Sequence, residues 1–277
     1  MDVYLGVMSP TERCVTFRRM HQSGCFVLPN PWDIGSARLL AGLGFPALAT
    51  TSSGFAWSLG RADNGVSLDE ALAHLRAIAG SVALPVNADF EGGFAVEPAA
   101  VAANVLRATG TGVAGLSIED STVDLASPLY QFDLAVERIR AARAAIDVSG
   151  TGVVLTGRSE GFIAGRPDLS ETIRRLVAYA EAGADCLYAP GLGARADIAT
   201  VVRAVAPLPV NVLIGAEGAS VTALADLGVR RISVGGALAR AAWGGFLEAA
   251  REIAERGTFT RLAAAVPFSE INWSFGR

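Results

Sequence analysis

Eight short apolar segments, separated by longer amphipathic stretches, constrain the fold of this chain more than any other feature. They cover residues 25–30, 47–50, 85–89, 115–120, 152–158, 185–190, 209–213 and 231–236. Most have the length and apolar content of strands that are buried on both faces. The stretches between them carry apolar residues three and four positions apart, which is the spacing of a helix with one buried face.

Helix signals fall between the strand candidates. Ser67-Leu68-Asp69-Glu70 is a capping box, which predicts a helix running to about residue 79 and stopping at Gly80. Asp168 or Ser170 can cap a second helix that ends at 182–183. Eight strands alternating with helices in 277 residues predict a single (β/α)8 barrel of the TIM type over 1–277. A doubly wound sheet is the second choice, because no GxGxxG follows the first strand.

The basic residues exclude several enzyme classes. All 23 of them are arginines, so the chain has no lysine. Schiff-base aldolases, pyridoxal-phosphate enzymes and P-loop nucleotidases each need a lysine amine at the reacting centre, and all three are excluded. The net charge of −4 also argues against nucleic-acid binding, which needs a concentrated basic surface.

The chain carries no signal for a membrane or for export. No apolar run approaches the roughly 18 residues of a membrane span, and Asp2 stands where a signal peptide has positive charge. Cys14, Cys25 and Cys186 are widely spaced and form no CxxC pair, so neither a disulfide framework nor a zinc knuckle is indicated. We therefore expect a cytoplasmic protein.

Only two histidines are present, His21 and His74, which leaves no histidine-based metal cluster. His21 lies in the N-terminal segment and His74 in an alanine-rich helix candidate. Both are expected away from the site, with solvated or locally bonded rings.

Polar side chains stand where several predicted strands end. Asp63 follows the second strand, Asn87 and Asp89 end the third, and Glu119 ends the fourth. Chemistry in such barrels sits at these carboxyl ends, and Asn87 and Asp89 face the same side of a regular strand. The set contains only oxygen ligands, which favours Mg²⁺ or Mn²⁺ over zinc. The alternative is that these carboxylates only cap helices or bond loop amides.

A second group of residues is suited to binding an anion. The planar fork of Arg158 matches a carboxylate or a phosphate, although the same residue could instead neutralise Glu119 or Glu160. Hydroxyls and backbone amides are offered after the second strand by Ser52, Ser53 and Gly54. The double glycine in 233–236 is a further possible anion site.

Six motifs, in this order, resemble the isocitrate lyase and phosphoenolpyruvate mutase superfamily. They are LPNPWD, SSG followed by LGRAD, VNADFEGGF, GLSIED, the arginine of TGRSE, and EAGAD, within residues 28–243. The likeness is to the branch of 2-methylisocitrate lyase and carboxyphosphonoenolpyruvate phosphonomutase. It implies a barrel whose last helix is swapped between two subunits in a dimer of dimers, a homotetramer. The C-terminal extension 258–277 is then expected to pack on a neighbouring subunit.

The resemblance also implies roles for individual residues. It assigns Mg²⁺ to the acids Asp63, Asp89 and Glu119, the first and last through water, with Asn87 as a further metal ligand. It assigns the carboxylate of the substrate to Ser53 and Gly54, beside Ser52, with help from Arg158 and Asn211. The residues implied to be catalytic are Arg158, Glu119 and Asp63.

Two departures from the family pattern bear on the activity. The usual Asp-Ala-Asp of the third strand is here Asn87-Ala88-Asp89. The lid segment 121–130 lacks both the cysteine of the lyases and the lysine and asparagine of the mutases. The acid–base candidates around this segment are therefore Asp120, Asp124 and Tyr130.

Three hypotheses follow. The first is a magnesium-dependent lyase that cleaves a C–C bond in a small 2-hydroxy or 2-oxo carboxylic acid and binds acids such as oxaloacetate, 2-oxoglutarate or pyruvate. The second is a P–C bond enzyme, similar to phosphonopyruvate hydrolase or carboxyphosphonoenolpyruvate mutase. The third is a barrel that binds 2-oxo acids without turning them over.

Overall fold

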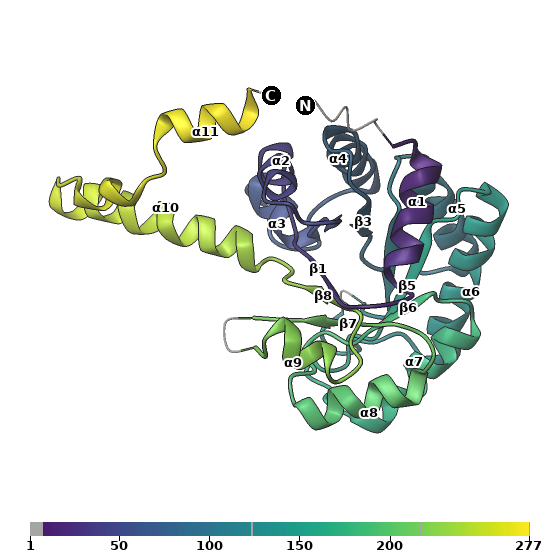
Figure 1. The fold of residues 1–277 in the computed structure, drawn as a ribbon. Helices are drawn as coiled ribbons and strands as arrows, with labels where there is room; N and C mark the ends of the chain where they lie inside the picture. Colours follow the sequence, from purple (N-terminus) through teal and green to yellow (C-terminus); the bar gives the residue numbers. More distant parts are fainter. Residues whose placement is uncertain (1–7, 123, 216–217, 277) are drawn as a thin grey trace.

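A nearly closed barrel of eight parallel strands forms the centre of the computed structural model, which describes residues 8–122, 124–215 and 218–276 (Figure 1). Asp2, Val123 and Arg277 lie outside the described residues. The strands are β1 (Phe26–Leu28), β2 (Leu48–Ala49), β3 (Val86–Asp89), β4 (Gly115–Glu119), β5 (Val154–Arg158), β6 (Cys186–Tyr188), β7 (Val210–Leu213) and β8 (Arg231–Ser233). Each lies within one of the eight predicted segments, and the prediction of a (β/α)8 barrel is confirmed.

The strands pair in the order β1-β8-β7-β6-β5-β4-β3-β2, and every pair is parallel. The backbone amide of Ala49 donates to the carbonyl of Pro29 at 3.0 Å, which brings β2 beside the end of β1. All eight carboxyl ends therefore open on one face of the barrel. Strands β3 and β7 are four apart in this ring, so they lie on opposite sides of it.

Helices connect the strands and cover the outside of the barrel, except for the first, which precedes β1, and the last three, at the C-terminal end of the chain (Figure 1). They are α1 (Pro10–Met20), α2 (Ile34–Gly42), α3 (Ser52–Ser58), α4 (Leu68–Ser81), α5 (Pro98–Thr109), α6 (Phe132–Ser149), α7 (Leu169–Glu181), α8 (Arg195–Val205), α9 (Val221–Ala225), α10 (Ala237–Arg256), the 3₁₀ helix η1 (Thr260–Ala264) and α11 (Phe268–Phe275).

The predicted caps are present at the starts of two helices. Ser67 and Glu70 form a capping box at α4, and the Asp168 side chain accepts from the Glu171 amide at 2.9 Å at α7. The predicted stop at Gly80 is wrong by two residues, because Gly80 keeps a helical backbone, α4 ends at Ser81 and Val82 is its C-cap. A glycine ends a helix where the backbone turns left-handed, and Gly80 does not do so.

Helix α1 closes the barrel at the amino ends of the strands. The Arg13 side chain donates to the carbonyl of Ala79, and Phe17 is fully buried. Gly115, the first residue of β4, lies so close to Phe17 that an added Cβ would come within 2.6 Å of its ring. Because α1 closes the amino end of the barrel, a ligand can enter at the carboxyl ends of the strands.

Both histidine side chains pack against aromatic residues and are shielded from water. The His21 ring packs edge-on against Phe17 and Phe26, and its Nδ1 lies 2.8 Å from the carbonyl of Phe17. The His74 ring stacks on Phe55 with 3.8 Å between centroids. Burial lowers the pKa of His21 to about 3 and that of His74 to about 4. The expectation of a locally bonded ring therefore fits His21, whereas neither histidine has a solvated ring.

The buried histidines predict a loss of stability in acid. Both rings are neutral in the folded protein, whereas the unfolded chain protonates them below about pH 6.5. Each histidine therefore contributes a fall in the free energy of unfolding as pH decreases from 6.5 towards 4, of at most ~1.4 kcal/mol per pH unit, while the buried acids with raised pKa values contribute in the opposite direction. A His74→Phe variant, which keeps the stacking on Phe55, is expected to show a shallower decline. Urea unfolding between pH 4.5 and 7.5 gives the free energy of unfolding of both proteins as a function of pH. An equal pH dependence in the wild type and in His74→Phe would contradict the assignment of a buried, neutral ring to His74.

The C-terminal part of the chain departs from the barrel. Helix α10 projects away from it, and α11 returns towards α2 (Figure 1). There Arg38 donates to the backbone carbonyl of Phe275 at 3.1 Å. Phe246 on α10 and Phe268 on α11 are 58% and 82% exposed, which is unusual for large apolar side chains. Among the described residues, no helix combines the length and apolar character needed to cross a membrane.

Candidate active site

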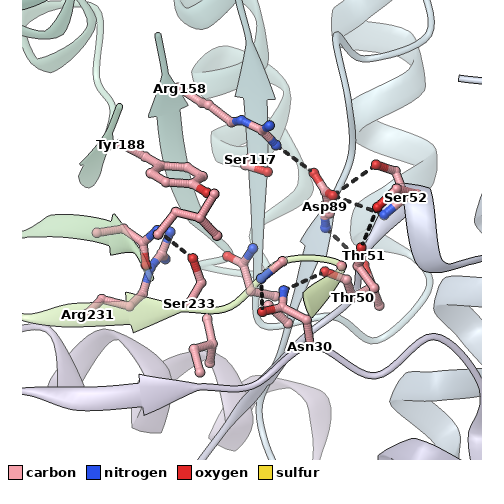
Figure 2. Close-up of a pocket in the computed structure, with 18 of the residues that line it drawn as sticks. Asn30, Thr50, Thr51, Ser52, Asp89, Ser117, Arg158, Tyr188, Arg231 and Ser233 are labelled. Carbon is pink, nitrogen blue, oxygen red and sulfur yellow. Dashed lines mark hydrogen bonds and ion pairs between the residues drawn. The ribbon is translucent and has the colours of Figure 1, made fainter. Parts of the chain in front are cut away.

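A cavity of about 190 Å³ opens at the carboxyl ends of the strands (Figure 2). It is smaller than the roughly 300–1,000 Å³ pockets that hold drug-sized ligands, and suits a small acid. Its lining includes these predicted site residues: Ser52, Ser53, Asp63, Asn87, Asp89, Arg158 and Asn211. Glu119 adjoins it through Arg158. The sequence-predicted residues from five strands and their loops thus come together.

Asp89 is the most firmly held carboxylate at the cavity. Its Oδ2 accepts from both the backbone amide and the hydroxyl of Ser52, each at 3.0 Å. Its own backbone amide donates to Thr50 Oγ1 at 2.9 Å (Figure 2). Asp89 therefore ties the end of β3 to the start of α3, with its Oδ1 directed to the arginine on β5.

Arg158 lies among three carboxylates. Its Nη1 is 3.1 Å from Asp89 Oδ1 and 3.1 Å from Glu119 Oε2, and its Nε donates to Glu160. The guanidinium also lies over the ring of Tyr188, 5.2 Å from the centroid. All of these groups are largely buried, so their charges act on one another with little screening by water. Here Arg158 neutralises acids and carries no surplus positive charge.

The acids of the site raise one another's pKa values. Burial raises the pKa of Glu119, and burial together with the charge of Asp89 raises that of Asp63 at the cavity rim. Glu91 was not predicted as a site residue. Burial and the charges of Asp89, Glu119 and Asp63 raise its pKa to about 8. A carboxyl group with a pKa of about 8 is mostly protonated at neutral pH, so the acids here outnumber the charge of the one arginine and some of them stay uncharged.

The loop that carries Glu91 has a constrained backbone. Glu91 has a φ of 48°, a left-handed conformation that is uncommon outside glycine. Arg138, a fully buried residue of α6, donates to the carbonyls of Gly92, Ala95 and Val96. The helix that follows β4 thus fixes the loop that follows β3.

The donor chemistry of the site fits a divalent cation such as Mg²⁺. The available ligands are hard oxygens from more acids than Arg158 alone can neutralise, and among the described residues the buried Asn87 Oδ1 has no hydrogen-bond partner. In the part of the chain that the structure describes, no three His, Cys, Asp or Glu side chains are arranged to hold a metal ion. A cation at Asp89 Oδ1 would compete with Nη1 of Arg158, which occupies that oxygen.

The donors expected to hold a substrate carboxylate after β2 are partly engaged. The Ser52 amide and hydroxyl bind Asp89, and the Gly54 amide donates to Thr51 Oγ1 at 3.3 Å to cap α3. The Ser53 hydroxyl lies 3.1 Å from Thr51 Oγ1. Gly54 has a separate structural reason to be glycine, because an added Cβ would come within 2.9 Å of Trp32.

The opposite wall of the cavity holds Asn211 and part of the possible anion site 233–236, together with Arg231 and Asn30, which were not predicted as site residues. Arg231 donates from Nε to Asn211 Oδ1 at 2.9 Å, and Asn211 Nδ2 donates to Ser233 Oγ at 2.9 Å. Asn30, after β1, accepts from the backbone amides of Val234 and Gly235 at 2.9 Å each. The signal available in the sequence was a polar residue in or next to an apolar strand segment.

The acid–base candidates around the lid do not line the cavity. Asp120 is buried and accepts hydrogen bonds from Tyr179 at 2.6 Å and Arg175 at 3.1 Å. Asp124 caps the Ala126 amide at 2.9 Å, and the ring of Tyr130 packs under Arg138. These three predictions of a catalytic group are therefore not supported by the geometry, since each side chain serves a contact elsewhere.

Comparison with known proteins places this arrangement in a family. The family model of phosphoenolpyruvate phosphomutase matches residues 17–254, most of the chain. The chain belongs to this family. The resemblance to the isocitrate lyase and phosphoenolpyruvate mutase superfamily is thereby confirmed, as is a lyase-type enzyme.

Three similar proteins illustrate the relationship. A crystal structure from Burkholderia cenocepacia J2315, described as a lyase/mutase, is 49% identical, with a TM-score of 0.94 over 97% of this chain and 98% of its own. An uncharacterized protein of Mycobacterium tuberculosis is 32% identical over 93% of this chain and 95% of its own. Oxaloacetate decarboxylase of Bradyrhizobium diazoefficiens is 30% identical over 65% of this chain and 64% of its own.

Proposed function

We propose that this phosphoenolpyruvate phosphomutase family member is a magnesium-dependent lyase that cleaves a C–C bond in a small 2-hydroxy or 2-oxo carboxylic acid. The observation that carries the proposal is the group of Asp89, Glu119 and Arg158 on three neighbouring strands beside a cavity of about 190 Å³. The similarity to an oxaloacetate decarboxylase supports C–C chemistry, and the similarity to a phosphonomutase structure from Burkholderia cenocepacia J2315, 33% identical over 90% of this chain, supports P–C chemistry as the second candidate.

The chain's own residues fix the reacting groups in place. Cleavage beside a carbonyl leaves a fragment whose oxygen gains negative charge, and Mg²⁺ bound near Asp89 and Glu119 would supply a Lewis acid there. Ser52 holds the Asp89 carboxylate through two hydrogen bonds, so little reorganisation is needed when charge develops. Arg158 supplies a cation that the neighbouring acids orient. With no lysine in the chain, a Schiff base cannot take over this stabilisation.

The experiment is a turnover assay on oxaloacetate and on small 2-hydroxy acids, with product analysis by NMR. Protein treated with EDTA is compared with the same protein after Mg²⁺ or Mn²⁺ is restored. We expect release of a 2-oxo acid above the rate of a protein-free sample with the same metal, and only when metal is present. Turnover of phosphonopyruvate without any C–C cleavage would instead indicate a P–C bond enzyme. Metal-dependent binding of 2-oxo acids with no product would indicate a binding barrel.

We further propose that α10 and the C-terminal segment 258–277 pack on a neighbouring subunit in a dimer of dimers. The exposed apolar residues Trp243, Phe246 and Phe268 support this, because such a surface is normally covered. Deletion from Pro267 is expected to reduce the number of subunits per particle, calculated from the molar mass measured by light scattering. Val148→Ser removes an exposed apolar side chain from α6 and serves as the control. An unchanged oligomer after the deletion would contradict this role for the end of the chain.

A further inference from the structure

The barrel interior contains a buried arginine whose hydrogen-bond partners are all neutral. Arg231 on β8 is 2% exposed and lines the cavity. Besides its bond to Asn211, its Nη2 donates to Thr156 Oγ1 on β5 at 3.0 Å, so the side chain spans the interior below the cavity. Its Nη1 lies 3.3 Å from His21 Nε2. A guanidinium has five N–H donors, and these bonds use three of them.

The histidine partner does not neutralise this charge. His21 Nδ1 lies 2.8 Å from the Phe17 carbonyl, which can only accept, so Nδ1 carries the proton and Nε2 accepts from Arg231. Asp185, a nearby acid, is already paired with Arg18 at 2.6 Å and Arg143 at 3.1 Å. Within the described ranges, no carboxylate forms an ion pair with Arg231. Buried charges are normally paired. Arg138 is also buried without an ion pair, but it binds three backbone carbonyls of a loop, whereas Arg231 lines the cavity.

The two arginines of the cavity lining therefore differ in charge balance. Arg158 is surrounded by three carboxylates, whereas Arg231 contacts only neutral groups. Figure 2 shows Asp89 and Ser52 on one side of the cavity and Arg231 and Ser233 on the other. A ligand between them meets a negative, cation-binding end and a positive end.

We propose that Arg231 is the counter-charge for a second carboxylate of the ligand, which selects small dicarboxylic 2-oxo or 2-hydroxy acids over their monocarboxylic analogues. Asn211 holds the guanidinium in position, Ser233 in turn accepts a hydrogen bond from Asn211, and both add polar groups at the same end. This inference rests on the proposed function and specifies its substrate class. The 2-oxo end of the acid then lies towards Asp89, and the distal carboxylate towards β8.

The test is calorimetric binding of two acids that differ only in the distal carboxylate, 2-oxoglutarate and 2-oxobutyrate, in the presence of Mg²⁺. The wild-type protein is expected to prefer 2-oxoglutarate by about 10- to 100-fold, the range for a hydrogen bond between charged groups. Arg231→Gln should remove this preference and leave 2-oxobutyrate binding unchanged. Arg231→Lys, which keeps the charge, should retain part of it. Arg230→Gln removes a neighbouring charge outside the cavity and serves as the matched control.

Several outcomes overturn the inference. They are equal wild-type affinity for the two acids, an unchanged preference in Arg231→Gln, and loss of the preference in Arg230→Gln. If Arg231→Gln does not fold, Ser233→Ala must weaken the binding of 2-oxoglutarate more than that of 2-oxobutyrate.

If the wild-type protein binds neither 2-oxo acid, the proposed function fails, and the binding of malonate then tests Arg231 alone. Malonate binding that is lost in Arg231→Gln supports the role, whereas absent or unaffected binding overturns it.

Discussion

Replacing Arg158 with methionine is expected to lower the free energy of unfolding by about 3–5 kcal/mol, because three largely buried carboxylates lose their shared cation. Asp89, Glu119 and Glu160 would then repel one another, and the pKa values of Glu119 and Glu160, which burial already raises, would rise further. The same change removes the cation that orients the acids of the site. Turnover is therefore expected to fall by about 10³-fold.

Two measurements separate these effects. Urea unfolding gives the stability, and kinetics well below the unfolding transition give the turnover of the folded fraction. Arg174→Met is the control, because Arg174 is exposed, pairs with Glu171 within one helix and should cost under about 1 kcal/mol. If the two substitutions lower the free energy of unfolding by the same amount, the ion pairs of Arg158 contribute no more than an exposed ion pair does.

The Asp89→Asn variant is expected to fold but to lose metal binding and nearly all turnover. An amide of the same shape can still accept the Ser52 hydrogen bonds through its oxygen, but it cannot supply the charge that Mg²⁺ and Arg158 meet at this position. We expect a fall of about 10³-fold in turnover, comparable with the loss of one strong electrostatic contact in a site that excludes water.

Manganese binding followed by electron paramagnetic resonance provides a readout that does not depend on activity. Wild-type protein should bind Mn²⁺, and the Asp89→Asn variant should bind it at least about tenfold more weakly. Asp69→Asn is the matched control, since Asp69 is exposed and bonds only Arg107 on the neighbouring helix. Intact turnover or unchanged Mn²⁺ binding in Asp89→Asn would refute the assignment of this carboxylate to the metal.

The barrel was predictable because its signals are local. Each strand is a short apolar segment, and the caps at Ser67 and Asp168 depend on residues three positions apart. The gathering of Asp89, Glu119 and Arg158 followed from the rule that carboxyl ends of parallel strands meet at one face. These inferences needed only the order of the elements and the side on which strands end.

What escaped prediction depends on side-chain direction and on partners distant in sequence. Asp120 follows a strand end as Glu119 does, yet it turns towards Tyr179 and Arg175 on α7 and serves the packing of that helix. The Gly54 amide was expected to face a ligand, but Thr51 uses it as a helix cap. Arg231 begins a strand segment, and only the closed barrel shows that its charge lies inside.

Helix α10 begins at Ala237, directly after Gly235 and Gly236, which line the cavity. Gly236 packs so tightly on α3 that an added Cβ would come within 2.9 Å of Ser53 Oγ and 3.1 Å of the Trp57 ring. The position of the projecting helix and the shape of the cavity wall are therefore separated by only two residues. If α10 packs on a neighbouring subunit as proposed, specific activity should depend on protein concentration, which would link catalysis to the abundance of the enzyme.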